Sequence, residues 1–356
     1  MVTIKDVAQL AGVTPSTVSR VINNTGRISE VTRQRVQQAI KDSGYRFNRN
    51  ARALVTKSSG IIGFVTNPDN GFFYANLLQE LSRCVLGQLQ RRMMLEFGQN
   101  NEAGELEAID RLLSESCEAI VVYSRHITEE SAKKLVESNT TPIVFLNRYF
   151  SSIPANCVGI DNVACGYLAT KTLINNGHRN IACIYGCPPY ASGQERLEGF
   201  KKAMEEHGLP IKPELMFSGL YVPQVGWDAV DKFQYHSFTA IFSSSIGQSV
   251  GAINALHRLG YRVPDDMSLV SIDNYVLNDY LNPALTAIEI PMDQLASTAI
   301  QRVQLLKDNS QVLENARIPG HLVERDSVKQ LAESDVNRRT VVYKVENVLE
   351  KAGEPE

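Results

Sequence analysis

The sequence of 356 residues contains no hydrophobic run of the roughly 20 residues that a membrane-spanning helix requires. Its start, MVTIKDVAQLAG, also lacks the apolar core of a secretory signal peptide. Hydrophobic residues make up 43% of the chain and charged residues 21%, a composition typical of soluble globular proteins. We therefore expect a cytoplasmic protein, and the length predicts two or three compact domains.

Cysteine and histidine are scarce, with six of each. The cysteines are scattered, no CxxC pair occurs, and their spacing to the histidines does not match a set of metal ligands. In a cytosolic protein this pattern indicates reduced thiols. We expect neither a metal nor another cofactor.

The common catalytic motifs are missing as well. No GxGxxG or Walker loop follows a predicted strand, no GxSxG motif occurs, and no His/Glu cluster has metal-ligand spacing. The sequence therefore favours a protein that is not an enzyme.

The net charge of −3 is unevenly distributed along the chain. Residues 1–60 contain ten Lys or Arg residues and three acidic residues, which gives +7, whereas the remainder carries −10. A basic segment on an acidic body is typical of nucleic-acid binding, because Lys and Arg release the counterions condensed on phosphates. A solvated charged surface is the alternative interpretation.

Three short helices are predicted within the basic segment. The residues Thr3 to Asp6 resemble a capping box that opens the first helix, and Gly12 ends it. Thr14 caps a second helix that runs from Pro15 to about Asn23, and Ser29 caps a third. Two helices joined by a short turn that contains glycine are typical of a helix-turn-helix.

The second helix has an apolar side and a polar side. Val18 and Val21 are predicted to face inward at helical spacing. The outer face keeps short polar side chains and one arginine: Ser16, Thr17, Ser19, Arg20 and Asn23. Such side chains suit hydrogen bonding to base edges and phosphates in the major groove, so residues 1–46 are predicted to bind DNA. An ordinary three-helix bundle with a solvated face is the alternative.

Residues 3–24, TIKDVAQLAGVTPSTVSRVINN, resemble the head of the lactose and galactose repressor (LacI/GalR) family, especially its galactose repressor branch. The resemblance extends to about residue 330. It implies a sequence-specific transcription regulator, a repressor, in which Pro15 and Ser16 select the operator sequence. The DNA-binding residues that it implies are Thr3, Thr14, Pro15, Ser16, Thr17, Ser19, Arg20, Asn23, Asn48, Ala51 and Leu54.

Residues 47–59 form a helix-prone segment that is too short to be stable alone in water. The resemblance implies that two such segments of a homodimer pair as hinge helices in the minor groove, where Leu54 wedges between base pairs. Phe47 stands where many family members have proline. A plain basic linker is the alternative.

From Gly60 onward, short apolar strands alternate with longer helical segments, and the pattern occurs twice. This alternation predicts parallel sheets covered on both faces. With the resemblance, it indicates an α/β periplasmic-binding-protein-like body of two doubly wound parallel-sheet lobes. The expected parts are an N-lobe of about 60–160 plus 291–320, a C-lobe of about 161–290 plus 321–330, and a frayed tail of 331–356. A tail that adds contacts through apolar residues at helical spacing within 341–349 is the alternative.

Doubly wound sheets bind ligands at the carboxyl ends of their strands, and two facing lobes create a cleft there. The residues expected to bind an effector are Asn70, Phe72, Phe73, Asn147, Arg148, Asp161, Arg196, Tyr221, Ser245 and Asp273. Their polar and aromatic character suits a multiply hydroxylated ligand such as a sugar. Arg196, expected to open a helix, and Asp273 supply a donor and an acceptor for hydroxyls. Phe72 and Phe73 could equally belong to the core, and Asp161 could only cap a helix.

The pair Ser245-Ile246 departs from the family pattern, which usually has Asn-Asp there. A short hydroxyl replaces an amide, and an acidic side chain is lost. The ligand is therefore expected to differ from a common hexose or to bind weakly.

Together these features predict a regulator whose operator affinity is controlled by a small sugar or related effector bound between two lobes. Its expected partners are a near-palindromic DNA operator, the effector and a second copy in a homodimer, with no membrane partner. Whether the effector releases DNA or acts as a corepressor stays open, because purine-type relatives use a corepressor. An enzymatic body, which the fold alone does not exclude, and a free sugar-binding protein are the alternatives.

The hinge interpretation is tested by replacing Leu54 with alanine. We expect Leu54→Ala to weaken operator binding far more than effector binding, because the wedge acts only in the DNA complex. Titrations with an operator duplex and with the effector, at one salt concentration, give both Kd values. Equal losses for the two ligands would contradict the assignment.

Overall fold

The computed structural model describes residues 2–23, 25–45, 59–67, 72–188, 190–273, 275–310 and 316–331. The chain divides into two compact units, Met1–Ser59 and Gly60–Glu356. Outside the described parts lie several predicted features: Asn48, Ala51, Leu54, Asn70, residues 332–356 and the side chains of Asn23 and Phe72.

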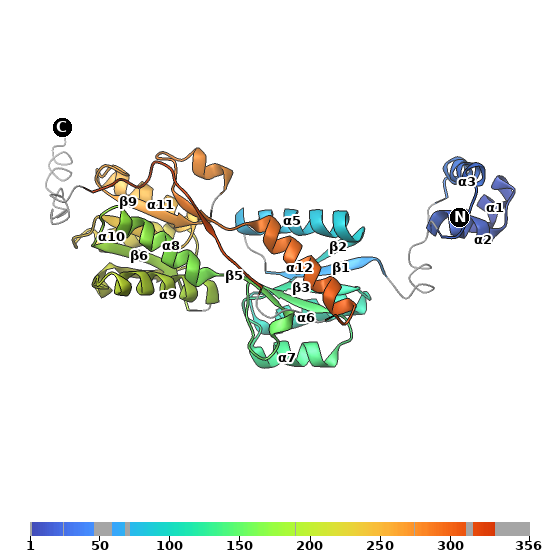
Figure 1. Cartoon of the computed structure of the whole chain (residues 1–356), viewed down its shortest axis with the longest axis horizontal. Helices are drawn as coiled ribbons and strands as arrows, with labels where there is room; N and C mark the ends of the chain where they lie inside the picture. Colours follow the sequence, from blue (N-terminus) through green and yellow to red (C-terminus); the bar gives the residue numbers. More distant parts are fainter. Residues whose placement is uncertain are drawn as a thin grey trace, which may run out of the picture. The chain divides into compact units, whose positions relative to one another are not determined.

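The first unit contains α1 (Ile4–Ala11), α2 (Pro15–Asn23) and α3 (Glu30–Ser43) (Figure 1). Buried residues from all three helices form its core: Val7, Ala8, Ala11, Val18, Val21, Val36 and Ala39. The inward orientation predicted for Val18 and Val21 is confirmed. The opposite side of α2 is thereby turned to solvent.

The predicted ends of these helices are confirmed by local hydrogen bonds. The Asp6 carboxylate accepts hydrogen bonds from the Thr3 N–H at 2.8 Å and from the Thr3 hydroxyl at 2.9 Å. Gly12 ends α1 in the left-handed region with φ 62°. The hydroxyls of Thr14 and Ser29 each accept from the backbone N–H three residues on, at 3.3 and 3.2 Å.

The second unit contains two six-stranded sheets, which confirms the prediction of two parallel-sheet lobes. The first sheet has the order β11-β5-β4-β3-β1-β2, and its paired strands are parallel. The second has the order β12-β10-β9-β8-β6-β7, with only the β10–β12 pair antiparallel. The strands are β1 (Ile61–Thr66), β2 (Arg92–Phe97), β3 (Ala119–Tyr123), β4 (Ile143–Leu146), β5 (Cys157–Ile160), β6 (Ile181–Gly186), β7 (Met216–Gly219), β8 (Ala240–Ser243), β9 (Ser268–Ile272), β10 (Ala287–Glu289), β11 (Ala316–Ile318) and β12 (His321–Val323).

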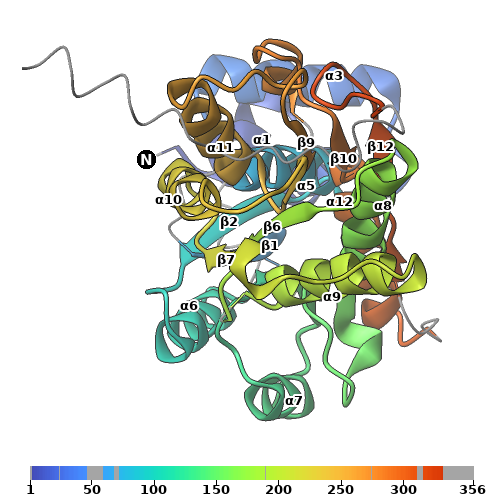
Figure 2. The same ribbon diagram turned by 90° about the vertical axis from the view of Figure 1, so that its left-hand side faces the viewer.

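Helices cover both faces of each sheet, as the doubly wound arrangement requires. In the first lobe α5 and α12 lie on one face, with α6 and α7 on the other (Figure 1). In the second lobe α8 and α9 pack together on one face and α10 and α11 on the other (Figure 2). The helices are α5 (Phe72–Leu89), α6 (Glu102–Ser114), α7 (Glu129–Ser138), α8 (Asn162–Asn175), α9 (Ala191–Glu206), α10 (Pro223–Phe233), α11 (Ile246–Arg258) and α12 (Met292–Lys307).

Some elements differ from the sequence-based expectation. Apolar runs predict seven strands, which correspond to β1, β3, β4, β5, β6, β8 and β9. The strands β2 and β7 were not predicted because they are half-buried edge strands, and β10, β11 and β12 were not predicted because each has only three residues. Helix α9 begins at Ala191, so Arg196 lies in its second turn and does not open the helix as expected.

The chain passes between the two lobes three times, in residues 160–162, 289–292 and 318–321. The Asp161 N–H donates to the Ile318 carbonyl at 2.9 Å, so two of the crossings are hydrogen-bonded to each other.

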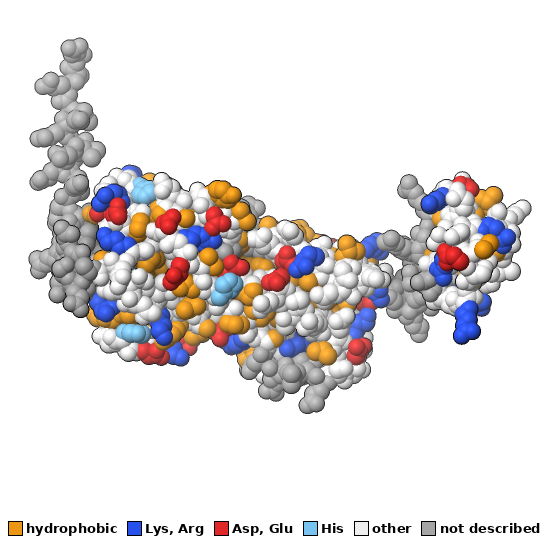
Figure 3. Space-filling model, turned by 45° about the horizontal axis from the view of Figure 1, so that its top comes forward, with side chains coloured by type: hydrophobic (Ala, Val, Ile, Leu, Met, Phe, Trp, Pro, Cys, Tyr) orange, Lys and Arg blue, Asp and Glu red, His pale blue; other side chains and the backbone are white. Residues whose placement is uncertain are grey.

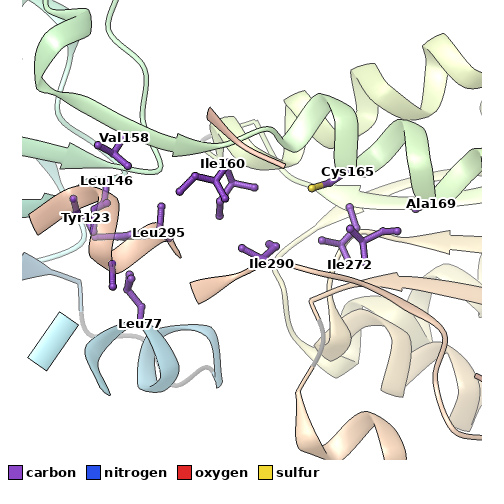
Figure 4. Packing of buried hydrophobic residues seen from close by; sticks show 14 of the residues in the cluster. Leu77, Tyr123, Leu146, Val158, Ile160, Cys165, Ala169, Ile272, Ile290 and Leu295 are labelled. Atoms are coloured by element: carbon purple, nitrogen blue, oxygen red, sulfur yellow. The ribbon is translucent and has the colours of Figure 1, made fainter. Parts of the chain in front are cut away.

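One buried apolar cluster continues through these crossings. It runs from Val158 and Ile160 on β5 to Cys165 on α8 and Ile272 on β9 (Figure 4). A Cβ atom on Gly320, at the third crossing, would lie 2.8 Å from the Cys165 sulfur, so a larger residue does not fit there. The two lobes therefore share one hydrophobic core.

Helices α10 and α11 pack so closely that glycine is required between them. A Cβ atom on Gly251 would lie 1.8 Å from the Pro223 carbonyl oxygen. We expect Gly251→Ala to lower the free energy of unfolding by about 1–3 kcal/mol, because the helices must separate. The matched control is Gly87→Ala on the exposed side of α5, where no atom other than those of its chain neighbours and its own helix backbone lies within 4 Å of the new Cβ. For Gly87→Ala we expect the free energy of unfolding to rise by roughly 0.5–1 kcal/mol, because alanine has the higher helix propensity. Denaturant unfolding measures both variants. A loss of stability in Gly87→Ala equal to that in Gly251→Ala would contradict the packing argument.

A buried histidine makes stability depend on pH. The His178 ring lies 2.9 Å from the Thr239 hydroxyl and 3.2 Å from the Lys329 carbonyl, and burial lowers its pKa from 6.5 to about 4. Because the unfolded chain then binds a proton that the folded chain does not, stability is full above pH 6.5 and falls as the pH drops towards 4. We expect about 2 kcal/mol of loss between pH 7.5 and 5. His178→Asn should lack this part of the pH dependence, whereas His321→Asn, at a 60% exposed side chain, should keep it; identical pH profiles for the two variants would refute the role of His178.

Candidate functional site

The solvent-facing side of α2 carries the polar groups expected to contact DNA. The predicted residues with described side chains are exposed or half-buried: Thr3, Thr14, Pro15, Ser16, Thr17, Ser19 and Arg20. The Thr14 hydroxyl lies 2.8 Å from the Ser16 hydroxyl and 2.9 Å from the Thr17 hydroxyl. The helix thus presents connected hydroxyls and one guanidinium, which can hydrogen-bond to base edges and phosphates.

The second unit contains a cavity of about 360 Å³ between its lobes. The strands β3, β4, β8 and β9 all end at it, as expected for a doubly wound sheet. Seven of the predicted effector residues line it: Phe73, Asn147, Arg148, Arg196, Tyr221, Ser245 and Asp273.

Asp161 was expected to bind the effector, but it does not line the cavity. Its carboxylate accepts a hydrogen bond from the Ala164 N–H at 2.8 Å and caps α8. The alternative interpretation of this residue as a helix cap is the one that the geometry supports.

The buried guanidinium of Arg196 forms the polar centre of the cavity. It donates from Nε to Asn162 Oδ1 at 2.9 Å and from Nη1 to the Ser244 carbonyl at 2.5 Å. Its Nη2 atom lies 3.6 Å from Asp273 Oδ1. Burial by itself lowers the pKa of Arg196, but the charges of Asp273 and other nearby groups raise it by more. The net pKa is therefore raised, and the Arg196 guanidinium stays positively charged.

Asp273 supplies the matching acceptor at the end of β9. It is 7% exposed and adopts φ 76°, a backbone conformation that is uncommon for a residue other than glycine. Its Oδ1 atom accepts no hydrogen bond from the described residues. Burial raises the pKa of Asp273 and Arg196 opposes the rise. A hydroxyl donor from a ligand would satisfy this oxygen.

Tyrosines form much of the wall, and sequence patterns missed most of them. Tyr74 and Tyr123 pack edge to face in the first lobe, with ring centroids 5.1 Å apart. Tyr190 and Tyr221 pack at 5.3 Å in the second lobe. Tyr123 is the last residue of β3, a position that could have signalled it. Such rings can pack on the apolar faces of a sugar.

Arg125 bridges the lobes and was also missed. Its guanidinium donates to the Tyr74 hydroxyl and lies 4.8 Å from the Tyr190 ring centroid, so it contacts α5 in one lobe and the start of α9 in the other. The loop that carries it is fixed from two sides. The buried Glu105 carboxylate accepts from the Arg125 N–H at 3.0 Å, and Arg148 donates to the Arg125 carbonyl at 2.9 Å.

Ser245 and Ile246 have different roles at the start of α11. The Ser245 hydroxyl accepts from the Gln248 N–H at 3.3 Å and caps the helix. Ile246 is 9% exposed and gives the cavity an apolar surface.

Among the residues that the structure describes, no group of three or more His, Cys, Asp or Glu side chains could hold a metal ion. None of the helices described has the length and apolarity needed to cross a bilayer. Acidic and basic side chains are interspersed over the face of the second unit in Figure 3.

A helix-turn-helix unit and a two-lobed body with a ligand-sized cavity define the class of ligand-responsive transcription regulators. Residues 3–48 match the family described as bacterial regulatory proteins, lacI family, and residues 170–328 match the periplasmic binding protein-like domain. The HTH-type transcriptional regulator AscG of Escherichia coli (strain K12) is 31% identical over 332 residues, which cover 92% of this chain and 98% of AscG. GalR of the same strain is 30% identical over 331 residues, which cover 92% and 96%.

The fold has a match among solved structures. The Lac repressor dimer bound to operator and the anti-inducer ONPF has a TM-score of 0.83 and 24% identity, with 92% of this chain and 99% of that chain covered. The chain belongs to the lacI family of bacterial regulatory proteins. It is an HTH-type transcriptional regulator, and the prediction of a regulator that is not an enzyme is confirmed by the names of these relatives.

Proposed function

We propose that this regulator is a repressor whose operator affinity is controlled by a sugar or related polyhydroxylated effector in the cavity between the lobes. The observation that carries the proposal is the buried Arg196–Asp273 pair, whose acceptor oxygen has no hydrogen-bond donor among the described residues. A buried polar group without a partner is costly, so it favours a ligand that supplies one.

The remaining lining agrees with such an effector. Asn147 offers an amide beside the Tyr123 hydroxyl at 3.2 Å, and Tyr221 offers an aromatic face. A volume of about 360 Å³ lies in the range of pockets that enclose small molecules. We assign effector contacts to Phe73, Asn147, Arg148, Arg196, Tyr221, Ser245 and Asp273.

The head is proposed to read an operator through the exposed side of α2. Its net charge of +7 over residues 1–60 favours a polyanion, and Ser16 and Arg20 are exposed on one helix face. A homodimer would place two such helices on a near-palindromic operator, and the Lac repressor likewise binds its operator as a dimer. Residues 47–59 would then act as the hinge between DNA and the body of residues 60–330. A chromosomal target implies action in the cytoplasm.

The effector acts by linkage. It shifts the regulator between DNA-competent and DNA-incompetent states only by the difference in its affinity for the two. Arg125 lines the cavity and contacts Tyr74 in one lobe and Tyr190 in the other, so a ligand that contacts Arg125 can act on the positions of both lobes.

A pair of variants tests the two functions separately. An operator duplex is first selected from a random library with the purified protein, and the effector is found by calorimetry with a sugar panel. We expect Arg20→Ala to weaken operator binding by about 10- to 100-fold and to leave effector binding unchanged. Asp273→Asn should weaken effector binding by about tenfold or more and remove its influence on the operator.

The control is Arg83→Ala, which removes an exposed arginine of the body beside Glu80. It should change neither affinity. Failure of every panel sugar to alter operator affinity, or turnover of a sugar by the purified protein, would overturn the proposal.

A further inference from the structure

The buried carboxylate of Glu118 lies outside the effector site. The residue directly precedes β3, and its side chain is only 6% exposed. It is not among the residues that line the cavity. A buried carboxylate is costly unless it is paired and hydrogen-bonded, so the partners of Glu118 indicate which parts of the fold it holds together.

These partners come from distant parts of the chain. The Oε1 atom of Glu118 accepts hydrogen bonds from the Gly60 N–H at 3.1 Å and from Arg91 Nε at 2.9 Å. Its Oε2 atom accepts from Lys307 Nζ at 2.7 Å, across 189 positions of the chain. Gly60 and Arg91 directly precede β1 and β2, and Lys307 is the last residue of α12. One side chain therefore holds three elements at the start of β3.

Gly60 is the point at which the chain enters the body. It is the first residue of the second unit and directly follows the predicted hinge, residues 47–59. Its φ of 69° lies in the left-handed region, which glycine adopts readily. Its carbonyl accepts from the Arg92 N–H at 3.0 Å, while its own N–H donates to Glu118. Both backbone polar groups are therefore bonded, and the entry point is fixed.

The bond to Lys307 connects this entry point to the core that both lobes share. Leu295, Ala299 and Val303 of α12 are fully buried in that core. Near the end of the helix, Arg302 donates from Nη1 to the Ala155 carbonyl at 2.7 Å. The helix is held along its length, so the ammonium group at its last residue is a firm partner for Glu118.

We propose that Glu118 is a positioning residue for operator binding, because it fixes the point at which each chain of the homodimer enters the body. The inference rests on the proposed function but concerns a group outside the effector site. A dimer binds two half-sites at a separation that its geometry sets. When two binding modules are linked, the second binds at an effective concentration that depends on how well the linkage matches the distance between the sites. A fixed entry point therefore favours one half-site spacing.

The experiment compares operators that differ only in half-site spacing. The full-length protein selects an operator duplex from a random library, and two further duplexes have one base pair more or one fewer at the centre. Fluorescence anisotropy at one salt concentration, without effector, gives the three Kd values. The spacing ratio is the Kd of an altered duplex divided by that of the selected duplex. We expect Glu118→Gln, which removes the charge and keeps the size, to lower this ratio by about threefold or more.

Two further variants locate the effect. Lys307→Met removes the ammonium group while Arg91 still pairs with Glu118, and it should lower the spacing ratio by about twofold or more. The matched control is Glu96→Gln, near the other end of β2, where the carboxylate pairs with Arg111 at 2.8 Å and is 25% exposed. This control should keep the wild-type ratio. Denaturant unfolding checks that each variant is folded.

The spacing ratio separates positioning from a loss of stability. A smaller folded fraction weakens binding to all three duplexes by the same factor and leaves the ratio unchanged. An unchanged ratio in Glu118→Gln therefore overturns the inference, and so does an equal fall in Glu96→Gln or a wild type that binds the three duplexes equally. A wild-type ratio in Lys307→Met overturns the part assigned to α12.

The proposed function fails by a different observation. If no panel sugar alters operator affinity, control by a sugar is contradicted. The spacing ratios are measured without effector, so they still decide whether Glu118 positions the heads.

Discussion

The buried guanidinium of Arg196 is the group on which the cavity depends. From α9 it reaches Asn162 on α8, the Ser244 carbonyl after β8 and Asp273 after β9. A buried cation requires such partners, because an uncompensated charge in the protein interior costs several kcal/mol. One side chain therefore fixes the relative positions of two strand ends and two helices, and the cavity takes its shape from them.

Close helix packing brings this guanidinium to its partners. A Cβ atom on Gly166 would lie 2.1 Å from the Arg196 carbonyl oxygen, and one on Gly199 would lie 2.1 Å from the Val163 carbonyl oxygen. Helices α8 and α9 thus meet backbone to backbone, and Asn162 comes within hydrogen-bond distance of Arg196. The apolar core shared by both lobes then holds the first lobe, with Arg125 and Asn147, across the cavity.

The parts of the site that sequence reasoning found are those that follow strands. Asn147 and Asp273 come directly after β4 and β9, so their place at the carboxyl edge could be inferred from the alternation of strands and helices. Asp161 follows β5 in the same way but caps α8. Position after a strand brings a residue to the edge of the sheet, whereas the direction of its side chain depends on the neighbouring helix. The alternation of strands and helices therefore predicted Asp161, a helix cap, as a site residue together with Asn147 and Asp273, which do line the cavity.

The sequence by itself determined the head, because caps, a glycine stop and helical apolar spacing act over a few residues. It also determined the two parallel sheets, because a strand buried on both faces needs a continuous apolar run. Only the tertiary structure decided which polar groups meet in the cavity. Arg125 and Tyr190 are 65 positions apart along the chain, and their contact depends on how two lobes with a common core face each other. Contacts of this kind have no local signal, since they arise from the packing of side chains whose neighbours are set by the whole fold.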